Sequence, residues 1–221
     1  EIEIIKIEDG ITCHERTKLA IEMYARQNNL PVVKPFILVA CRDITHAKQV
    51  EELLQSDRIF HCAYKGKVLR IDSSSKKDED IERQFVALES PDNEIEIVVH
   101  VNMLKEGWDV NNLYTIIPLR ASNAAILIEQ TIGRGLRLPY GGQRTGNKDV
   151  DTLTVIAHDN FQKVIDEANK GNSLLKRVSF IELEDRDERE QGGRVETTPT
   201  STEQILLRNC LKLELKKCYR A

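Results

Sequence analysis

Residues 36–55, FILVACRDITHAKQVEELLQ, decide the fold class of this chain. The run Phe36–Ala40 is apolar at every position, as in a strand buried on both faces, which is typical of a parallel sheet. Asp43 or Thr45 can cap a following helix that runs to about Gln55 and carries its apolar residues on one face. The stretch therefore predicts one β-α unit of an α/β domain.

The same alternation of strand and helix continues along the chain. We expect further strands at Lys67–Ile71, Ile95–Val101, Tyr114–Leu119 and Leu153–Ala157, and helices at Asp80–Glu89, Ser122–Leu136 and Phe161–Ala168. A succession of βαβ units packs helices on both faces of a parallel sheet. The sequence therefore predicts a three-layer α/β domain with a mostly parallel sheet.

The chain ends do not follow this alternation, and they set the expected domain boundaries. We interpret residues 1–30 as a lead-in segment, in which Ile2–Ile7 alternates apolar and charged residues like an edge strand and a helix follows at Glu15–Gln27. The α/β domain is expected at residues 31–171.

Residues 172–221 change in character and are expected to form a C-terminal arm. Ile181–Glu190 is dominated by charge, and Gln191–Thr202 is rich in Gly, Thr, Ser and Pro, which is typical of a linker. The tail Ile205–Leu215 is amphipathic and is predicted to be helical.

Composition and charge exclude several classes of protein. The chain has 221 residues, of which 40% are hydrophobic and 31% charged, as in a folded domain. No apolar run approaches the roughly 20 residues of a membrane-spanning helix. The net charge of -4 and the pI of about 5.8 argue against a basic nucleic-acid coat, for which a pI above roughly 9 is typical. The chain begins at Glu1 rather than Met, and we interpret it as a piece of a longer protein.

The cysteines and histidines form no recognisable site. The five cysteines are odd in number and scattered, which favours cytoplasmic thiols over a disulfide framework. The pairs Cys13-His14 and His61-Cys62 lack the usual spacing of zinc ligands, so no metal is expected. No catalytic partner is evident for His46, His61, His100 or His158.

The segment Gln130-Thr131-Ile132-Gly133-Arg134-Gly135-Leu136-Arg137 is the strongest candidate for a functional site. At about 100° per residue on a helix, Gln130, Arg134 and Arg137 share one face. The apolar residues share the opposite face: Ala125, Ile128 and Ile132. The two glycines cost roughly 1 kcal/mol each relative to alanine, which indicates close approach of a ligand or backbone, or an early helix end. The alternative is a solvated basic face.

The loop Asn102–Asp109, which follows the strand expected at Ile95–Val101, is the second candidate. Ligands of open parallel sheets bind beyond the carboxyl ends of the strands. Gly107 permits a positive φ, and Asp109 offers an acceptor for a ribose hydroxyl or an arginine. The alternative is a turn glycine followed by a capping aspartate.

Together, Lys105–Asp109 and the Gln-x-x-Gly-Arg-x-x-Arg pattern of Gln130–Arg137 resemble motifs V and VI of superfamily-two helicases and translocases. The stretch Met103–Gly141 resembles the DEAD/DEAH-like restriction subunit of type III restriction-modification enzymes. The resemblance covers most of Phe36–Ala168 and implies the second RecA-like domain of that motor.

What the resemblance implies is a split ATPase site. ATP and Mg²⁺ would be held mainly by a first RecA-like domain of the same polypeptide, and Arg134 and Arg137 would reach the γ-phosphate from this one. A planar guanidinium suits spread phosphate charge. Gln130 would help to order the interface. The nucleotide side would be lined by Gly107, Asp109 and Gly133.

The chain lacks the first half of such a motor. It contains no Gly-x-x-x-x-Gly-Lys-Ser/Thr run, since Gly66-Lys67 lacks the leading glycine and precedes Val68, and it contains no Asp-Glu-x-His. We therefore expect this chain alone to bind no cofactor and to hydrolyse no ATP.

The resemblance also implies a nucleic-acid path across the opposite rim of the domain. Loops that follow strands offer side chains and backbone N–H groups that can bind phosphates, and each candidate has an alternative role in a cap or turn. The candidates are Arg42, Asp43, Ser73, Ser74 and Asn102.

The sequence thus favours the C-terminal motor domain of an ATP-dependent DNA helicase or translocase of a type III restriction endonuclease. Its expected partners are DNA and a modification (methyltransferase) subunit. Glu182–Asp185 lacks a following x-Lys, so no nuclease site is expected within the chain. Two alternatives remain open, a non-catalytic RecA-like binding module and a repair or RNA helicase domain of the same superfamily.

Overall fold

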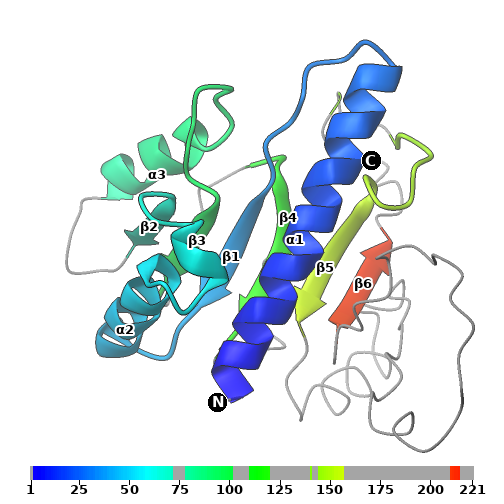
Figure 1. Cartoon of the computed structure of the whole chain (residues 1–221). Helices are drawn as coiled ribbons and strands as arrows, with labels where there is room; N and C mark the ends of the chain where they lie inside the picture. The colour runs from blue at the N-terminus through cyan, green and yellow to red at the C-terminus, as the bar shows by residue number, and fades with distance from the viewer. Residues whose placement is uncertain are drawn as a thin grey trace, which may run out of the picture.

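The computed structural model describes residues 2–71, 78–101, 110–119, 140, 144–156 and 210–214. The strands of this part form a six-stranded sheet in the order β2-β3-β1-β4-β5-β6 (Figure 1). The strands are β1 (Phe36–Ala40), β2 (Val68–Ile71), β3 (Ile97–His100), β4 (Leu113–Pro118), β5 (Thr152–Ile156) and β6 (Cys210–Glu214). The first five are parallel to one another and β6 is antiparallel to β5. The predicted α/β class with a mostly parallel sheet is confirmed.

The helix α2 (Ile44–Gln55) forms where residues 36–55 predict it. Of the two possible caps the structure uses Asp43, whose side chain accepts a hydrogen bond from the His46 N–H and so satisfies a free donor of the first turn. The helix buries Ala47, Val50 and Leu54 against the sheet.

The short 3₁₀ helix η1 (Phe60–Cys62) connects α2 to β2, and the helix α3 (Asp78–Ala87) connects β2 to β3. The path from β1 to β2 and the path from β2 to β3 run in opposite directions along the sheet. Right-handed crossovers therefore place α2 and α3 on opposite faces, which gives three layers. The helices predicted at Ser122–Leu136 and Phe161–Ala168 lie outside the described residues.

The expectation of an edge strand at Ile2–Ile7 is wrong. These residues begin α1 (Ile2–Gln27), a single helix that crosses β4 and β5 in Figure 1. The buried residues of α1 recur at helical spacing along its whole length: Ile7, Ile11, His14, Ile21 and Ala25 are fully buried. This stripe gains its burial from the sheet, so the tertiary contact overrides the alternation of the first residues.

Gly10 is the point of closest approach between α1 and the sheet. A Cβ placed there would lie 2.3 Å from Ile117 Cδ1 and 2.8 Å from Ile117 Cγ1. On this face the core joins α1 and α2 to β1, β3 and β4, with Ile37, Val39 and Val99 at its centre. Because α1 packs on the sheet, it is part of the same core.

The expectation of a helical tail at Ile205–Leu215 is wrong for its second half. Cys210–Glu214 forms β6, which pairs with β5 from Thr152↔Glu214 to Ile156↔Cys210. The segment Cys-Leu-Lys-Leu-Glu alternates apolar and polar residues with the period of a strand. The edge of β5 offers free backbone groups, and pairing with them decides between the two periods.

A membrane-spanning helix is absent from the described part of the chain, where even α1 is too polar to cross a bilayer.

Candidate functional site

The carboxyl ends of four parallel strands lie level with one another. The last residue of β1, Ala40, pairs with His100 of β3 and Pro118 of β4, and His100 also pairs with Ile71 of β2. Ligands of open α/β sheets bind at this edge. Every residue predicted above to bind nucleotide or nucleic acid follows one of these four strand ends in the sequence. All of the predicted loops therefore begin at the same edge of the sheet.

The order of the strands separates the two sequence motifs by one strand. Residues 102–109 follow β3 and residues 120–139 follow β4, and β1 lies between them. At about 4.8 Å per strand, the two segments leave the sheet roughly 10 Å apart, with Arg42 and Asp43 between them.

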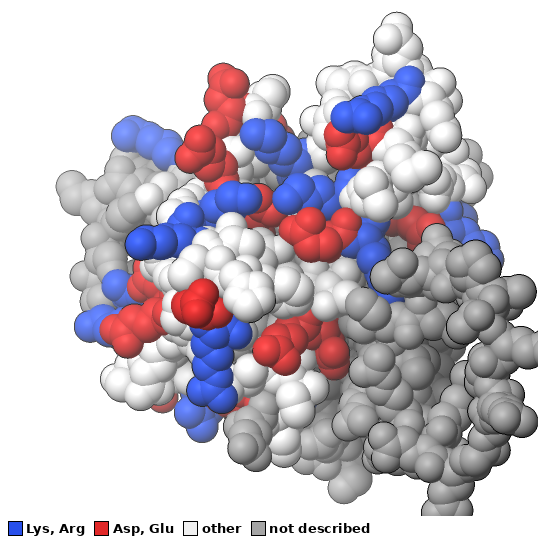
Figure 2. Space-filling model, viewed as in Figure 1, with Lys and Arg blue, Asp and Glu red and all other residues white. Residues whose placement is uncertain are grey.

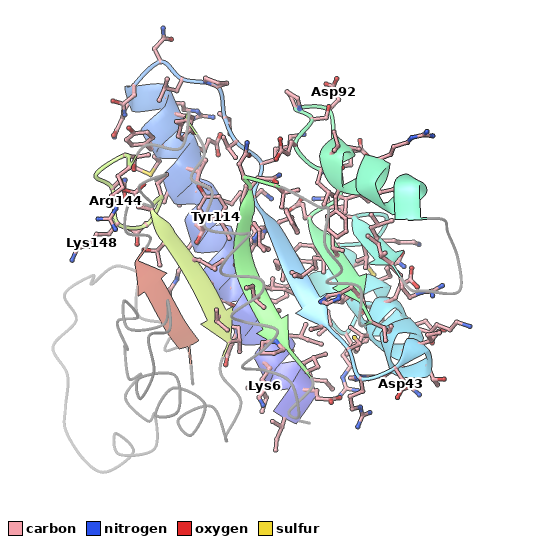
Figure 3. The ribbon with its side chains drawn as sticks, turned by 180° about the vertical axis from the view of Figure 1, so that it is seen from behind. Lys6, Asp43, Asp92, Tyr114, Arg144 and Lys148 are labelled. Carbon is pink, nitrogen blue, oxygen red and sulfur yellow. The ribbon has the colours of Figure 1, made fainter. Side chains whose placement is uncertain are left out.

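Only the two residues that follow β1 can be placed among the predicted site residues. Arg42 and Asp43 are both exposed, and Asp43 lies at the same end of the sheet as Lys6 of α1 (Figure 3). The remaining predicted residues lie outside the described residues: Ser73, Ser74, Asn102, Gly107, Asp109, Gln130, Gly133, Arg134 and Arg137.

The buried His46, in the first turn of α2, holds the Arg42–Asp43 loop. Its ring is 4% exposed, and its Nδ1 accepts a hydrogen bond of 3.3 Å from the Arg42 N–H. Since Nδ1 is an acceptor, the ring proton belongs on Nε2, which lies 3.2 Å from Glu3 Oε2. We call Glu3, Arg42, Asp43 and His46 the His46 bridge. It was missed by sequence reasoning, which treated Glu3 as part of a strand.

Two other groups at this edge are held in their neutral forms. Burial lowers the pKa of His100 to about 4, and neither ring nitrogen has a hydrogen-bond partner in the described part of the chain. Burial raises the pKa of the Cys41 thiol to about 12, with a further contribution from the charges of Glu3 and Asp43. His100 is therefore uncharged and Cys41 is no nucleophile at neutral pH.

A second polar cluster lies at the opposite, amino edge of the sheet. Glu96, just before β3, accepts hydrogen bonds from Lys18 of α1 at 2.7 Å and from Lys67 at 2.6 Å. His14 Nε2 lies 3.8 Å from Glu96 Oε2, which is an electrostatic contact rather than a hydrogen bond. The Tyr64 hydroxyl donates to Glu15 at 2.7 Å. We call these six residues the Glu96 cluster.

The Glu96 cluster also has the geometry of a potential metal site, because one ligand atom each of His14, Glu15 and Glu96 lies within 4.8 Å of the others. Two ammonium groups already neutralise Glu96, and Lys18 Nζ lies 3.5 Å from Glu15 Oε1 as well. A divalent cation would have to displace Lys18. We therefore assign this cluster to the attachment of α1 to the sheet.

Replacing Glu96 with glutamine is expected to lower the free energy of unfolding at pH 7 by about 1–2 kcal/mol. A broken buried pair costs about 3–5 kcal/mol, and the two lysines, 40% and 39% exposed, reduce this value. Burial alone would raise the pKa of Glu96, but contacts with His14, Lys18 and Lys67 outweigh it and hold that pKa well below its usual range. The stabilisation is therefore present above the unfolded pKa, about 4.3, and is lost as the pH falls below it.

Urea unfolding of both proteins between pH 7 and pH 3 checks this result. The wild type should lose stability toward low pH more steeply than Glu96→Gln. Glu22→Gln, in an exposed pair with Arg26, is the matched control and should change stability by less than about 0.5 kcal/mol. If the free energies of unfolding of Glu96→Gln and wild type fell equally between pH 7 and pH 3, the result would contradict the role of the cluster.

The fold and its carboxyl edge define an α/β domain of the RecA-like class. The sequence model of the helicase conserved C-terminal domain matches residues 26–139, which is just over half of the 221 residues. The chain therefore belongs to the helicase C-terminal domain family.

The chain is also similar to two curated relatives. The type III restriction-modification enzyme EcoPI Res subunit of Escherichia phage P1 is 30% identical over 115 residues. The EcoP15I Res subunit of Escherichia coli is equally similar over the same length. Each match covers 49% of this chain but only 11% of the relative, so the chain spans about a ninth of the proteins it resembles.

Two solved structures show weaker likeness. Mss116p DEAD-box helicase domain 2 bound to an RNA duplex is 9% identical, with a TM-score of 0.36 over 62% of this chain and 48% of that one. T4 UvsW is 24% identical, with a TM-score of 0.36 over 62% of this chain and 25% of that one. The family assignment does not depend on these two likenesses.

Proposed function

We propose that this chain is the second motor domain of an ATP-dependent DNA translocase or helicase of the type III restriction kind. The observation that carries the proposal is the family match over residues 26–139, which includes both sequence motifs. The similarity to two Res subunits favours the restriction branch. The parent reaction would be ATP hydrolysis coupled to movement on DNA and then DNA cleavage, in the cytoplasm.

In this proposal Arg134 and Arg137 bind the γ-phosphate of an ATP whose Mg²⁺ and phosphates are held mainly by a first RecA-like domain. The bound nucleotide supplies the bond that is hydrolysed. The roughly 10 Å between the carboxyl ends of β3 and β4 suits a ligand of nucleotide size. Gln130 would order the interface, and Gly107, Asp109 and Gly133 would line the nucleotide side.

Nucleic acid would contact the loops after β1, β2 and β3, through Arg42, Asp43, Ser73, Ser74 and Asn102. The surface supports a small contact rather than a broad one. Figure 2 shows acidic and basic side chains interspersed over the described part of the face formed by α1 and α2. Together with the net charge of -4, this pattern favours a narrow rim of phosphate contacts. A modification (methyltransferase) subunit would supply DNA recognition in the full assembly.

The isolated chain is expected to bind DNA weakly, because it makes only a few phosphate contacts, and with strong salt dependence, because these electrostatic contacts supply nearly all of its affinity. Fluorescence anisotropy with a labelled duplex at roughly 20 to 200 mM salt measures the slope of log K against log salt. Arg42→Ala should reduce that slope by about 1.

Arg58→Ala is the matched control for this titration. Arg58 is exposed and follows α2, so it lies toward the amino edge and should leave the slope unchanged. Nanomolar affinity that is insensitive to salt would contradict a motor rim of this kind, as would an equal loss of slope in both arginine variants.

A further inference from the structure

The loop that separates the two motif-bearing segments is held by a single buried ring. Arg42 and Asp43 are exposed, whereas His46 is 4% exposed. The His46 backbone N–H donates to Asp43 Oδ1 at 2.8 Å, and its Nδ1 accepts from the Arg42 N–H. A helix cap needs only the hydrogen bond from the His46 N–H to Asp43. The hydrogen bond from the Arg42 N–H to Nδ1 fixes the loop backbone as well.

The third contact of His46, made by its ring, leads out of α2 altogether. Its Nε2 donates to Glu3, 43 residues away in the first turn of α1. The helix α1 packs on β1, β4 and β5 and is pinned at the far edge by the Glu96 cluster. The loop after β1 therefore takes its position from α1 as well as from its own strand.

We propose that His46 is a positioning residue that couples α1 to the nucleic-acid edge through Glu3. The inference rests on the proposed function, because it assigns the Arg42–Asp43 loop to DNA. With the bridge intact, the backbone of Arg42 keeps a fixed place beyond the end of β1, between the carboxyl ends of β3 and β4. Without it, the loop keeps its helix cap but loses the tie to α1.

Two variants of Glu3 isolate the hydrogen bond from the charge. Glu3→Gln keeps an acceptor for the His46 Nε2–H, whereas Glu3→Ala removes it, and both remove the same negative charge. Loss of a negative charge alone should strengthen DNA binding. Weaker binding in Glu3→Ala, with binding retained in Glu3→Gln, therefore has the opposite sign to the electrostatic effect.

The experiment measures DNA affinity by anisotropy and amide exchange at Arg42 for the same set of proteins. We expect His46→Ala and Glu3→Ala to lose between about twofold and tenfold in affinity, the range for one or two hydrogen bonds. Glu3→Gln should bind at least as well as wild type. Thr45→Ala, an exposed change in the same helical turn, is the control and should have no effect.

Amide exchange at Arg42 should accelerate in His46→Ala and Glu3→Ala but not in Glu3→Gln. Equal affinities for Glu3→Ala and Glu3→Gln would overturn the proposal, as would losses that merely follow the unfolded fraction from thermal melting. Failure of the wild type to bind DNA at the lowest salt would overturn the proposed function and the DNA role together. The exchange data would then still decide whether Glu3 and His46 hold the loop.

Discussion

If the proposed roles of Arg134 and Arg137 hold, replacing either with alanine in the full-length protein is expected to reduce ATP turnover by about a hundredfold or more, the loss typical of an arginine finger. On the predicted helix both side chains lie opposite the apolar face of Ile128 and Ile132. Truncation therefore removes charge without opening a core cavity, and stability should change by less than about 0.5 kcal/mol. Steady-state ATPase rates and melting temperatures on the same preparations check both halves of the prediction.

Three further proteins make that result specific. Arg134→Lys should also fail, because an ammonium cannot make the bidentate contact. Arg58→Ala should hydrolyse ATP normally. The chain of residues 1–221 alone should show no turnover, since it contains no phosphate loop. Near-normal turnover in both alanine variants would make this face a solvated basic one, and a large fall in melting temperature would make the arginines structural.

Replacing Gly10 with valine is expected to destabilise the protein by about 3 kcal/mol, and replacing it with alanine by about 1–2 kcal/mol. Alanine improves helix propensity by up to about 1 kcal/mol, but overpacking a core costs about 1–3 kcal/mol. A Cβ at this position would lie 2.3 Å from Ile117 Cδ1 and 3.3 Å from Ile156 Cγ1. Because these contacts lie in the core, the clash should outweigh the propensity gain. Urea unfolding gives the change in free energy.

A double-mutant cycle with Ile117→Val tests the cause of that loss. Valine at 117 removes the Cδ1 atom, so Gly10→Ala should cost less in this background than in wild type. Met23→Ala, on the outer face of α1 at a residue 52% exposed, is the control and should change stability little. Additive losses would show that α1 shifts to make room and that Gly10 is not required for the close approach.

Local pattern was sufficient to predict most of the central domain. The uninterrupted apolar run Phe36–Ala40 places β1 in a parallel sheet, because only a strand covered on both faces can be apolar at every position. A cap at Asp43 or Thr45 follows from the need of the first turn of α2 for an acceptor, and the structure uses Asp43. Both signals depend on neighbours within a few residues, so the sequence carries them in full.

The corrections concern segments whose local pattern supports two structures. Ile2–Ile7 alternates like a strand, yet it begins a helix because its apolar residues continue at helical spacing into the stripe that β4 and β5 bury. Cys210–Glu214 has both periods, and the open edge of β5 selects the strand. Each choice depends on a surface built by distant parts of the chain.

The sequence by itself determined the α/β class, the succession of strands and helices along its central part and the residues that resemble helicase motifs, since these follow from local period and from spacing along the chain. Only the tertiary structure decided which distant residues meet. Glu3 reaches His46 across 43 residues, and Lys18 reaches Glu96 across 78. Such pairs leave no periodic signal, because the contact depends on the packing of a whole helix against the sheet rather than on the residues beside either partner.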